Sequence, residues 1–238
     1  MLTCCVFGVA SSALGETYRD DRNHFTITVP DGWVAIAPET IEMVNATIRE
    51  QMRNSKTQGV EHDAGFQLEG TPPLAYPYFL VQGIRQDFSE MSYSALERGL
   101  GVGVEDGVQE ASEAFSEFMD NAEIGKPILD REKGRIMTSV EMDVVGVGEV
   151  KGISVGWLSK DGIMNIHCYA RASDFDKWAP TFETITNSLQ FDEGYKFKPK
   201  MNSVLSSAMR GAIIGGVVGG LGSLIFAGVR ASKKKKAA

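Results

Sequence analysis

The feature that most limits how this chain can fold is an uncharged segment near its C-terminus. Residues 211–229 contain no Asp, Glu, Lys or Arg, and Arg210 and Arg230 bound the segment. As an α-helix, these 19 residues would extend about 28 Å, close to the hydrocarbon thickness of a bilayer. The alternative is a disordered glycine-rich tail, but such tails contain Ser, Gln and charges instead of Ile, Val, Leu and Phe. We therefore predict one transmembrane helix at 211–229.

Small residues recur at every fourth position of this predicted helix. One row consists of Gly211, Gly215, Gly219, Ser223 and Ala227, and a second row of glycines lies beside it. Residues four apart share one helix face, and small side chains there let another helix approach closely. The pattern resembles the glycine-zipper segments of membrane proteins. We expect the first row to contact another membrane helix, either of a second copy or of a partner protein.

Positive charges follow the predicted span at once. The last segment, 230–238, contains Arg230, Lys233, Lys234, Lys235 and Lys236. A basic cluster beside a span favours the cytoplasmic side, where it also meets anionic lipid. The sequence thus predicts a basic cytoplasmic tail on the surface of the lipid bilayer. The final Lys-Lys-Ala-Ala also resembles an endoplasmic-reticulum retrieval signal, although a stop-transfer cluster is the simpler interpretation.

The N-terminus has the pattern of a secretory signal peptide. An apolar run from Leu2 to Ala10 is followed by small residues, and Ala13 and Gly15 fit the −3 and −1 positions of a cleavage site before Glu16. No Lys or Arg precedes the run, so a short buried or interfacial segment is the alternative. A signal peptide at 1–15 and a cytoplasmic tail at 230–238 predict the same topology, a single-pass protein with an extracytoplasmic body.

Charge and cysteine content exclude several classes of function. All 31 acidic residues precede Gly211, whereas 5 of the 24 basic residues follow it. Such an acidic body makes nucleic acid an unsuitable partner. Two of the three cysteines lie in the first five residues, which leaves Cys168 alone in the body. The histidines, His24, His62 and His167, share no spacing that would indicate a metal site.

The body reads as alternating strands and helices ahead of a polar, basic stalk at 192–210. Period-2 alternation and turn signals predict strands, and apolar residues three and four apart predict helices. The predicted strands are 25–29, 78–86, 135–145, 150–158 and 163–171, the last two joined as a hairpin through residues 160–162. The predicted helices are 39–52, 92–119 and 173–191, with Pro180 expected at an entry or kink. Sheet hairpins between helices indicate an α+β fold with a mainly antiparallel sheet.

Two short stretches suggest a family for the domain at 16–191. The segments FTITVPDGW, from Phe25, and WAPTFETITNSLQF, from Trp178, resemble the first hairpin and the last helix of PsbP/Mog1-like domains. Relatives of that fold include photosystem accessory proteins, a Ran-binding protein and bacterial envelope lipoproteins. The resemblance implies an α/β/α sandwich that binds a partner and catalyses nothing. It assigns no metal or partner residues here.

One sequence pattern is of catalytic type. Gly152, Ser154 and Gly156 match the G-x-S-x-G nucleophile elbow, and a triad in hydrolase order would need Asp161 and His167. That motif requires a sharp strand-to-helix turn, whereas here the predicted strand continues into a hairpin. We therefore do not expect a triad.

Three other features also have ordinary structural explanations. The glycines between Gly99 and Gly107 lack the lysine of a phosphate-binding loop, and close helix packing explains them. Cys168 faces the apolar side of its strand and is expected to be a buried thiol. His167 faces the more polar side, where we expect a satisfied histidine at the surface or under a helix. The sequence predicts no catalytic, cofactor-binding or metal-binding residues.

These observations favour a membrane-anchored extracytoplasmic binding or accessory domain that is not an enzyme. It would associate through its domain surface, with a protein as partner, and through the glycine face of its helix. A structural accessory subunit of a larger membrane complex is the first alternative. A membrane-tethered hydrolase is the second.

Overall fold

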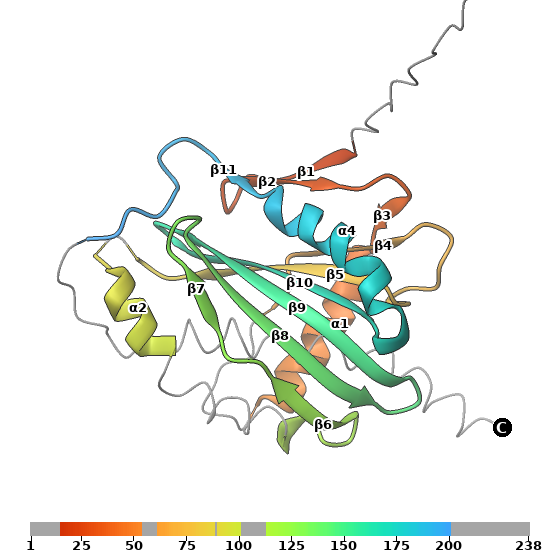
Figure 1. The fold of residues 1–238 in the computed structure, drawn as a ribbon. Helices are drawn as coiled ribbons and strands as arrows, with labels where there is room; N and C mark the ends of the chain where they lie inside the picture. The colour runs from red at the N-terminus through yellow and green to blue at the C-terminus, as the bar shows by residue number, and fades with distance from the viewer. Residues whose placement is uncertain (1–14, 54–60, 89, 101–112, 201–238) are drawn as a thin grey trace, which may run out of the picture.

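A computed structural model describes residues 15–53, 61–88, 90–100 and 113–200 of the chain (Figure 1). The predicted transmembrane helix at 211–229, the tail at 230–238 and nearly all of the predicted signal peptide lie outside these ranges. The same holds for the predicted helix-contact row that starts at Gly211 and for the predicted membrane-surface residues from Arg230 on. Within the described ranges, none of the helices has the length and hydropathy needed to cross a membrane.

The described domain is built on one large antiparallel sheet. Its strand order is β3-β4-β5-β10-β9-β8-β6, and β7 also pairs with β8. The strands are β3 Trp33–Ala35, β4 Ala64–Leu68, β5 Tyr78–Arg85, β6 Met119–Ile124, β7 Ile128–Asp130, β8 Arg135–Val144, β9 Gly148–Ser159 and β10 Gly162–Arg171. Lys160 and Asp161 form the tight turn between β9 and β10, which confirms the predicted hairpin. The central strands begin and end within two residues of their predicted bounds, and in β8 buried and more exposed residues alternate along the whole strand.

A smaller sheet contains both ends of the domain. Its order is β1-β2-β11, with β1 at Glu16–Asp20, β2 at Phe25–Val29 and β11 at Gln190–Phe191. The turn after β2 closes through a hydrogen bond from Trp33 N to Pro30 O of 3.2 Å, and Gly32 adopts a φ of 76°. That turn leads into β3 of the large sheet, so the expectation that FTITVPDGW forms a hairpin is wrong. The hairpin partner of β2 is the preceding strand β1.

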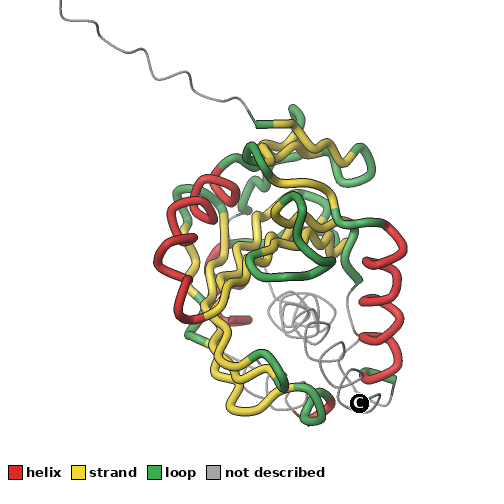
Figure 2. The backbone as a smooth tube through the Cα atoms, turned by 90° about the vertical axis from the view of Figure 1, so that its right-hand side faces the viewer, coloured by secondary structure: helices red, strands yellow, loops and turns green. Residues whose placement is uncertain are grey.

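Helices lie on both faces of the large sheet. Figure 2 shows α1, Pro38–Gln51, on one side of the strands and α4, Phe175–Asn187, on the other. A short 3-10 helix, η1 Ala172–Asp174, precedes α4, and α2, Tyr93–Leu100, follows β5. The fold is thus a mainly antiparallel, sheet-rich α+β structure with a few helices, as the sequence predicted.

The two faces of β10 separate two apolar cores. Cys168 and its even-numbered neighbours pack with Phe182 and Ile185 of α4, in a cluster that also contains the side chains of β2. Tyr169 on the opposite face packs with Val44 and other residues of α1. Cys168 is 0% exposed, which confirms the predicted buried thiol. Fully burying one large apolar side chain in such a core contributes about 1.5–3 kcal/mol.

Two predicted helices end earlier than the sequence suggested. The predicted helix 92–119 is wrong at its end, because Met119 begins strand β6 and pairs with Val144. The predicted helix 173–191 ends at Asn187, after which Gln190–Phe191 forms β11.

Pro180 lies inside α4 and not at an entry. The proline removes the donor that would reach the carbonyl of residue 176. Both residues are exposed, so water can satisfy that carbonyl at little cost.

Residues 192–200, which we call the strap, run over the surface of the domain. Asp192 N donates to His24 O at 2.9 Å, and Lys160 N donates to Tyr195 O at 3.0 Å. Further along, Lys200 N donates to Met91 O at 2.9 Å. The first half of the predicted stalk is therefore part of the domain surface, and residues 201–210 lie outside the described ranges.

Candidate functional site

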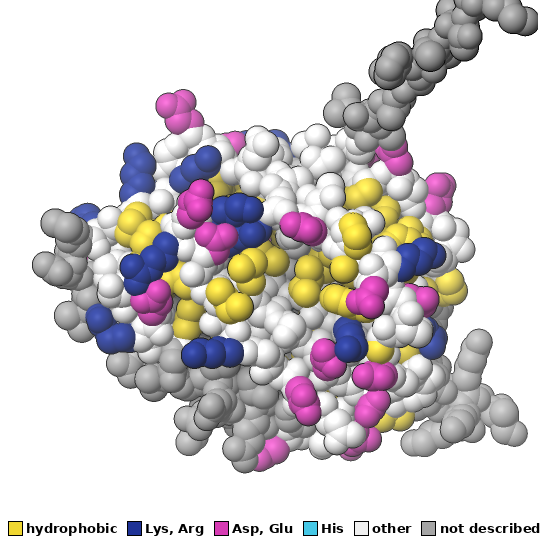
Figure 3. Space-filling model, in the orientation of Figure 1, with side chains coloured by type: hydrophobic (Ala, Val, Ile, Leu, Met, Phe, Trp, Pro, Cys, Tyr) yellow, Lys and Arg dark blue, Asp and Glu magenta, His cyan; other side chains and the backbone are white. Residues whose placement is uncertain are grey.

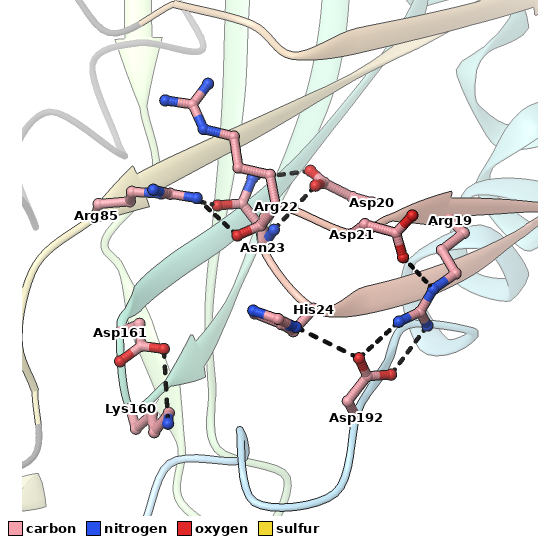
Figure 4. A network of polar contacts seen from close by, with 10 residues as sticks. All are labelled: Arg19, Asp20, Asp21, Arg22, Asn23, His24, Arg85, Lys160, Asp161 and Asp192. Carbon is pink, nitrogen blue, oxygen red and sulfur yellow. Dashed lines mark hydrogen bonds and ion pairs between the residues drawn. The ribbon is translucent and has the colours of Figure 1, made fainter.

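The turn between β1 and β2 forms one wall of a polar surface cleft (Figure 4). The Asp20 carboxylate accepts hydrogen bonds from Asn23 N at 2.9 Å and from Asn23 Nδ2 at 2.8 Å. His24 completes the turn in a left-handed conformation with a φ of 57°. Asp and Asn stabilise turns in this way because their short side chains reach the backbone two or three residues away.

Arg85, the last residue of β5, joins this turn to the large sheet. Its Nε donates to Asn23 Oδ1 at 3.3 Å, and its Nη2 donates to Arg22 O at 2.6 Å. In Figure 4 the Arg22 guanidinium points away from this network. The resulting cleft has a volume of about 520 Å³ and is lined by Arg22, Asn23, His24, Arg85, Gln86, Asp87, Ser159, Asp161 and Met164. Two guanidinium groups and two carboxylates are among these residues, so the cleft can bind a polar group through hydrogen bonds and charge.

The strap lies beside the cleft and is attached to the β1–β2 turn and the β9–β10 turn by ionic and aromatic contacts. Arg19 donates to both carboxylate oxygens of Asp192, at 2.9 and 2.7 Å, and this guanidinium holds the pKa of Asp192 below its ordinary value. The His24 ring stacks on Tyr195 with centroids 3.8 Å apart, and Lys160 Nζ lies 4.1 Å from the Tyr195 ring centroid. The strap thereby fixes the β1–β2 turn against the β9–β10 turn.

A second group of polar residues is buried on the α1 face of the large sheet. Gln82, Asn165 and His167 are at most 4% exposed. Asn165 Nδ2 donates to Gln82 Oε1 at 3.2 Å, and His167 Nε2 lies 3.3 Å from the same oxygen. Ser154 Oγ lies 2.6 Å from His167 Nδ1. We call these four side chains the buried polar row, in which Ser154 is only partly buried.

The buried polar row has a consistent assignment of donors and acceptors. The amide oxygen of Gln82 only accepts, so His167 Nε2 carries the proton and Nδ1 accepts from the Ser154 hydroxyl. Burial lowers the pKa of His167 well below its ordinary value, and neighbouring His62 lowers it further. The imidazole is therefore neutral and fully hydrogen-bonded, and the expectation of a satisfied histidine is confirmed, at a buried site.

His62 lies beside this row with its ring unsatisfied. The ring is 3% exposed, and neither Nδ1 nor Nε2 has a hydrogen-bond partner among the described residues. It meets the His167 ring edge to face, with centroids 5.7 Å apart. Its backbone is held on both sides by Asn45 of α1, which donates to His62 O at 3.0 Å and accepts from His62 N at 2.8 Å. Burial lowers the pKa of His62 to about 3.

The nucleophile-elbow pattern does not form a triad. Ser154 lies in the middle of the straight strand β9, and the sharp turn that the motif needs is not there. Asp161 lies in the β9–β10 turn, six residues and about 20 Å along the strand from His167. The third partner of the Ser154–His167 pair is the neutral amide of Gln82. Sequence reasoning found the serine and the histidine but missed the amide, which lies 85 residues from His167.

The structure describes only part of the glycine run from Gly99 to Gly107. Gly99 is buried in α2, and the remaining glycines of that run, through Gly107, lie outside the described residues. In the described part of the chain, no three His, Cys, Asp or Glu side chains gather closely enough to hold a metal ion. Sequence reasoning also missed the buried polar row as a unit, although Asn165 and His167 stand at alternate positions of β10.

Comparison with known proteins finds likeness in structure alone. No protein-family model and no curated protein matches the sequence. The chain is similar to the solution structure of cyanobacterial PsbP (CyanoP) from Synechocystis sp. PCC 6803, with 14% identity and a TM-score of 0.46 over 80% of this chain and 99% of that one. A likeness at this level carries no argument about function. The fold class rests on the strand order and helix placement described above.

Proposed function

We propose that this chain is a membrane-anchored binding or accessory domain, held outside the cytoplasm by the helix predicted at 211–229. The support for the anchor is the length of the uncharged segment between Arg210 and Arg230 and its row of small residues. The partner of the helix would be another membrane helix, and the partner of the domain surface a protein. The charged cleft beside the strap is the surface we assign to that second contact.

One observation favours binding over catalysis. The Ser154–His167 pair is closed by the amide of Gln82, where a hydrolase needs a carboxylate to stabilise the imidazolium that forms during reaction. Burial also opposes that charge, because the pKa of His167 is far below its ordinary value. A serine beside such a histidine is not activated as a nucleophile.

The helix contact is tested by replacing two small residues of the predicted row in the full chain. Gly215→Leu combined with Gly219→Leu adds bulk where a second helix would approach. We expect chemical crosslinks to a second copy or to a partner protein to be lost while the domain stays folded. The matched control is Ile213→Leu with Val217→Leu, which lies off the row. Unchanged crosslinking in the glycine variant would remove the helix contact from the proposal.

The hydrolase alternative has one contact in its favour, the 2.6 Å separation of Ser154 Oγ and His167 Nδ1. A fluorophosphonate probe labels activated serines, so we expect it not to label Ser154 in the native chain. Labelling that disappears in Ser154→Ala, in a protein that remains folded, would favour the hydrolase.

The accessory-subunit alternative differs from a lone anchored domain in its stoichiometry. If the chain belongs to a larger complex, extraction in mild detergent followed by mass measurement must show a stoichiometric companion. A particle with the mass of this chain alone, or of its own oligomer, favours the lone domain.

A further inference from the structure

The strap alternates aromatic and basic residues along its exposed length. Tyr195 stacks on His24, and the Phe197 ring packs edge-on against Tyr93 of α2 with centroids 5.4 Å apart. Lys196 lies between these two aromatic residues and Lys198 follows them, and both lysines are exposed. Neither lysine forms an ion pair with any residue that the structure describes. The aromatic side chains thus hold the strap on the domain while two unpaired ammonium groups face solvent.

A second cleft beside the strap adds one more lysine to this surface. The cleft has a volume of about 390 Å³ and lies between α2, the β7–β8 turn and the strap. Its aromatic walls are Tyr93, Trp157, Phe191 and Phe197, and its charged rim consists of Lys133, Lys196 and Glu132. In Figure 3 the Lys and Arg side chains on this side of the molecule lie among exposed apolar ones, over the end that holds α2 and β7. We call Tyr93, Lys133, Lys196, Phe197 and Lys198 the strap face.

The opposite end of the large sheet has the opposite charge. On neighbouring strands, Asp120 pairs in register with Asp143, and Asp143 with Glu149. Glu123 likewise pairs with Glu141. Figure 3 shows the Asp and Glu side chains gathered over this end, at the lower right. The domain therefore carries a charge asymmetry that would orient it in front of a charged surface.

The position of the strap limits how far its end at Lys200 can lie from the predicted membrane helix. Only residues 201–210 separate Lys200 from the predicted span, and fully extended they reach about 35 Å at most. We propose that the strap face docks on the anionic phospholipid headgroups of the bilayer that holds the chain. This inference rests on the proposed anchor. Basic side chains near such a surface each increase partitioning by about fivefold, and interfacial aromatic residues add to it.

The test uses the full chain reconstituted in nanodiscs, one set of phosphatidylcholine and one with about a third phosphatidylglycerol. The acetylation rate of each lysine by a water-soluble reagent is read by mass spectrometry. We expect Lys133, Lys196 and Lys198 to react about fivefold or more slowly in the anionic discs, and high salt to remove this protection by screening. Lys177 on α4 is the internal control and should react equally in both. Equal rates for all four lysines in the two lipids would overturn the inference.

The second part of the experiment reverses the charge of the two strap lysines. Lys196→Glu with Lys198→Glu changes only exposed side chains and should abolish the protection of Lys133, whereas Lys177→Glu should leave it intact. Protection that appears only in native membranes, and in neither nanodisc, would mean that the strap face binds a protein and would overturn the lipid assignment. A chain that fails to enter nanodiscs refutes the anchor itself, while a chain that enters with unprotected lysines refutes only the docking.

Discussion

Acid should destabilise this domain through the buried His62. The folded-state pKa of His62 is about 3, because burial disfavours the charged ring, whereas an unfolded chain gives it a pKa near 6.5. The unfolded state therefore binds the extra proton first as pH falls. The stabilising contribution is fully present above about pH 6.5 and is lost progressively toward the folded pKa of about 3.

The size of the effect follows from this difference in pKa. A pH of 5 is about 1.5 units below the pKa of the histidine in the unfolded chain, whereas the folded ring is still neutral at this pH. The difference corresponds to about 2 kcal/mol of lost stability. His167 adds to the loss in the same direction, because its pKa is also lowered by burial. This is a large part of the 5–15 kcal/mol that is typical of a domain.

The assay is urea unfolding of the full chain in mild detergent at pH 7.5 and pH 5. Trp33, Trp157 and Trp178 are the only tryptophans in the sequence, so their fluorescence reports the domain. His62→Leu removes a ring whose nitrogens have no partner among the described residues, and the acid-induced loss should shrink by about 2 kcal/mol. Ile48→Val is the control, because it should lower the free energy of unfolding by about 1 kcal/mol, and by the same amount at both pH values. An identical acid-induced loss in wild type and His62→Leu would refute the reasoning.

Three further outcomes test the packing and the charges of the large sheet. Glu123 lies opposite Glu141, so Glu123→Lys should stabilise the domain by about 0.5 kcal/mol, measured as a higher Tm. Burial raises the pKa of the Cys168 thiol, so iodoacetamide should modify Cys168 only after denaturation, as mass spectrometry would show. A Cβ at Gly65 would lie 2.5 Å from Leu80 Cδ2, so Gly65→Ala should cost about 1–3 kcal/mol in urea unfolding.

The central strands and α1 could be predicted because their pattern is local. In β8, buried and more exposed residues alternate over ten residues, and this period sets both the strand and the face that is buried. The Lys160-Asp161-Gly162 turn is a local signal of the same kind. The predicted helix runs into the start of β6 because Phe115 and Phe118 continue the helical spacing of the apolar residues before them, whereas Met119 pairs with Val144 in the sheet.

The rest of the fold and the candidate site depend on contacts between distant segments. Strand β11 is two residues long, and only its pairing with β2 makes it a strand. The lysines of the strap favour its interpretation as a basic stalk. The aromatic residues Tyr195 and Phe197, which alternate with these lysines, instead indicate a segment that packs on the domain. The amide of Gln82, which contacts His167 of the Ser154–His167 pair, belongs to β5. No local sequence pattern predicts this contact between distant segments.

The small sheet has a mechanical consequence. Because β1 and β11 flank β2, the first and last strands of the described domain are held by one strand and lie close together. A pulling force applied between the two ends would load the strap contacts and then the short ladder of β11, with two paired residues, before it reached the long central strands. The strap and β11 would detach in turn while the large sheet kept its hydrogen bonds.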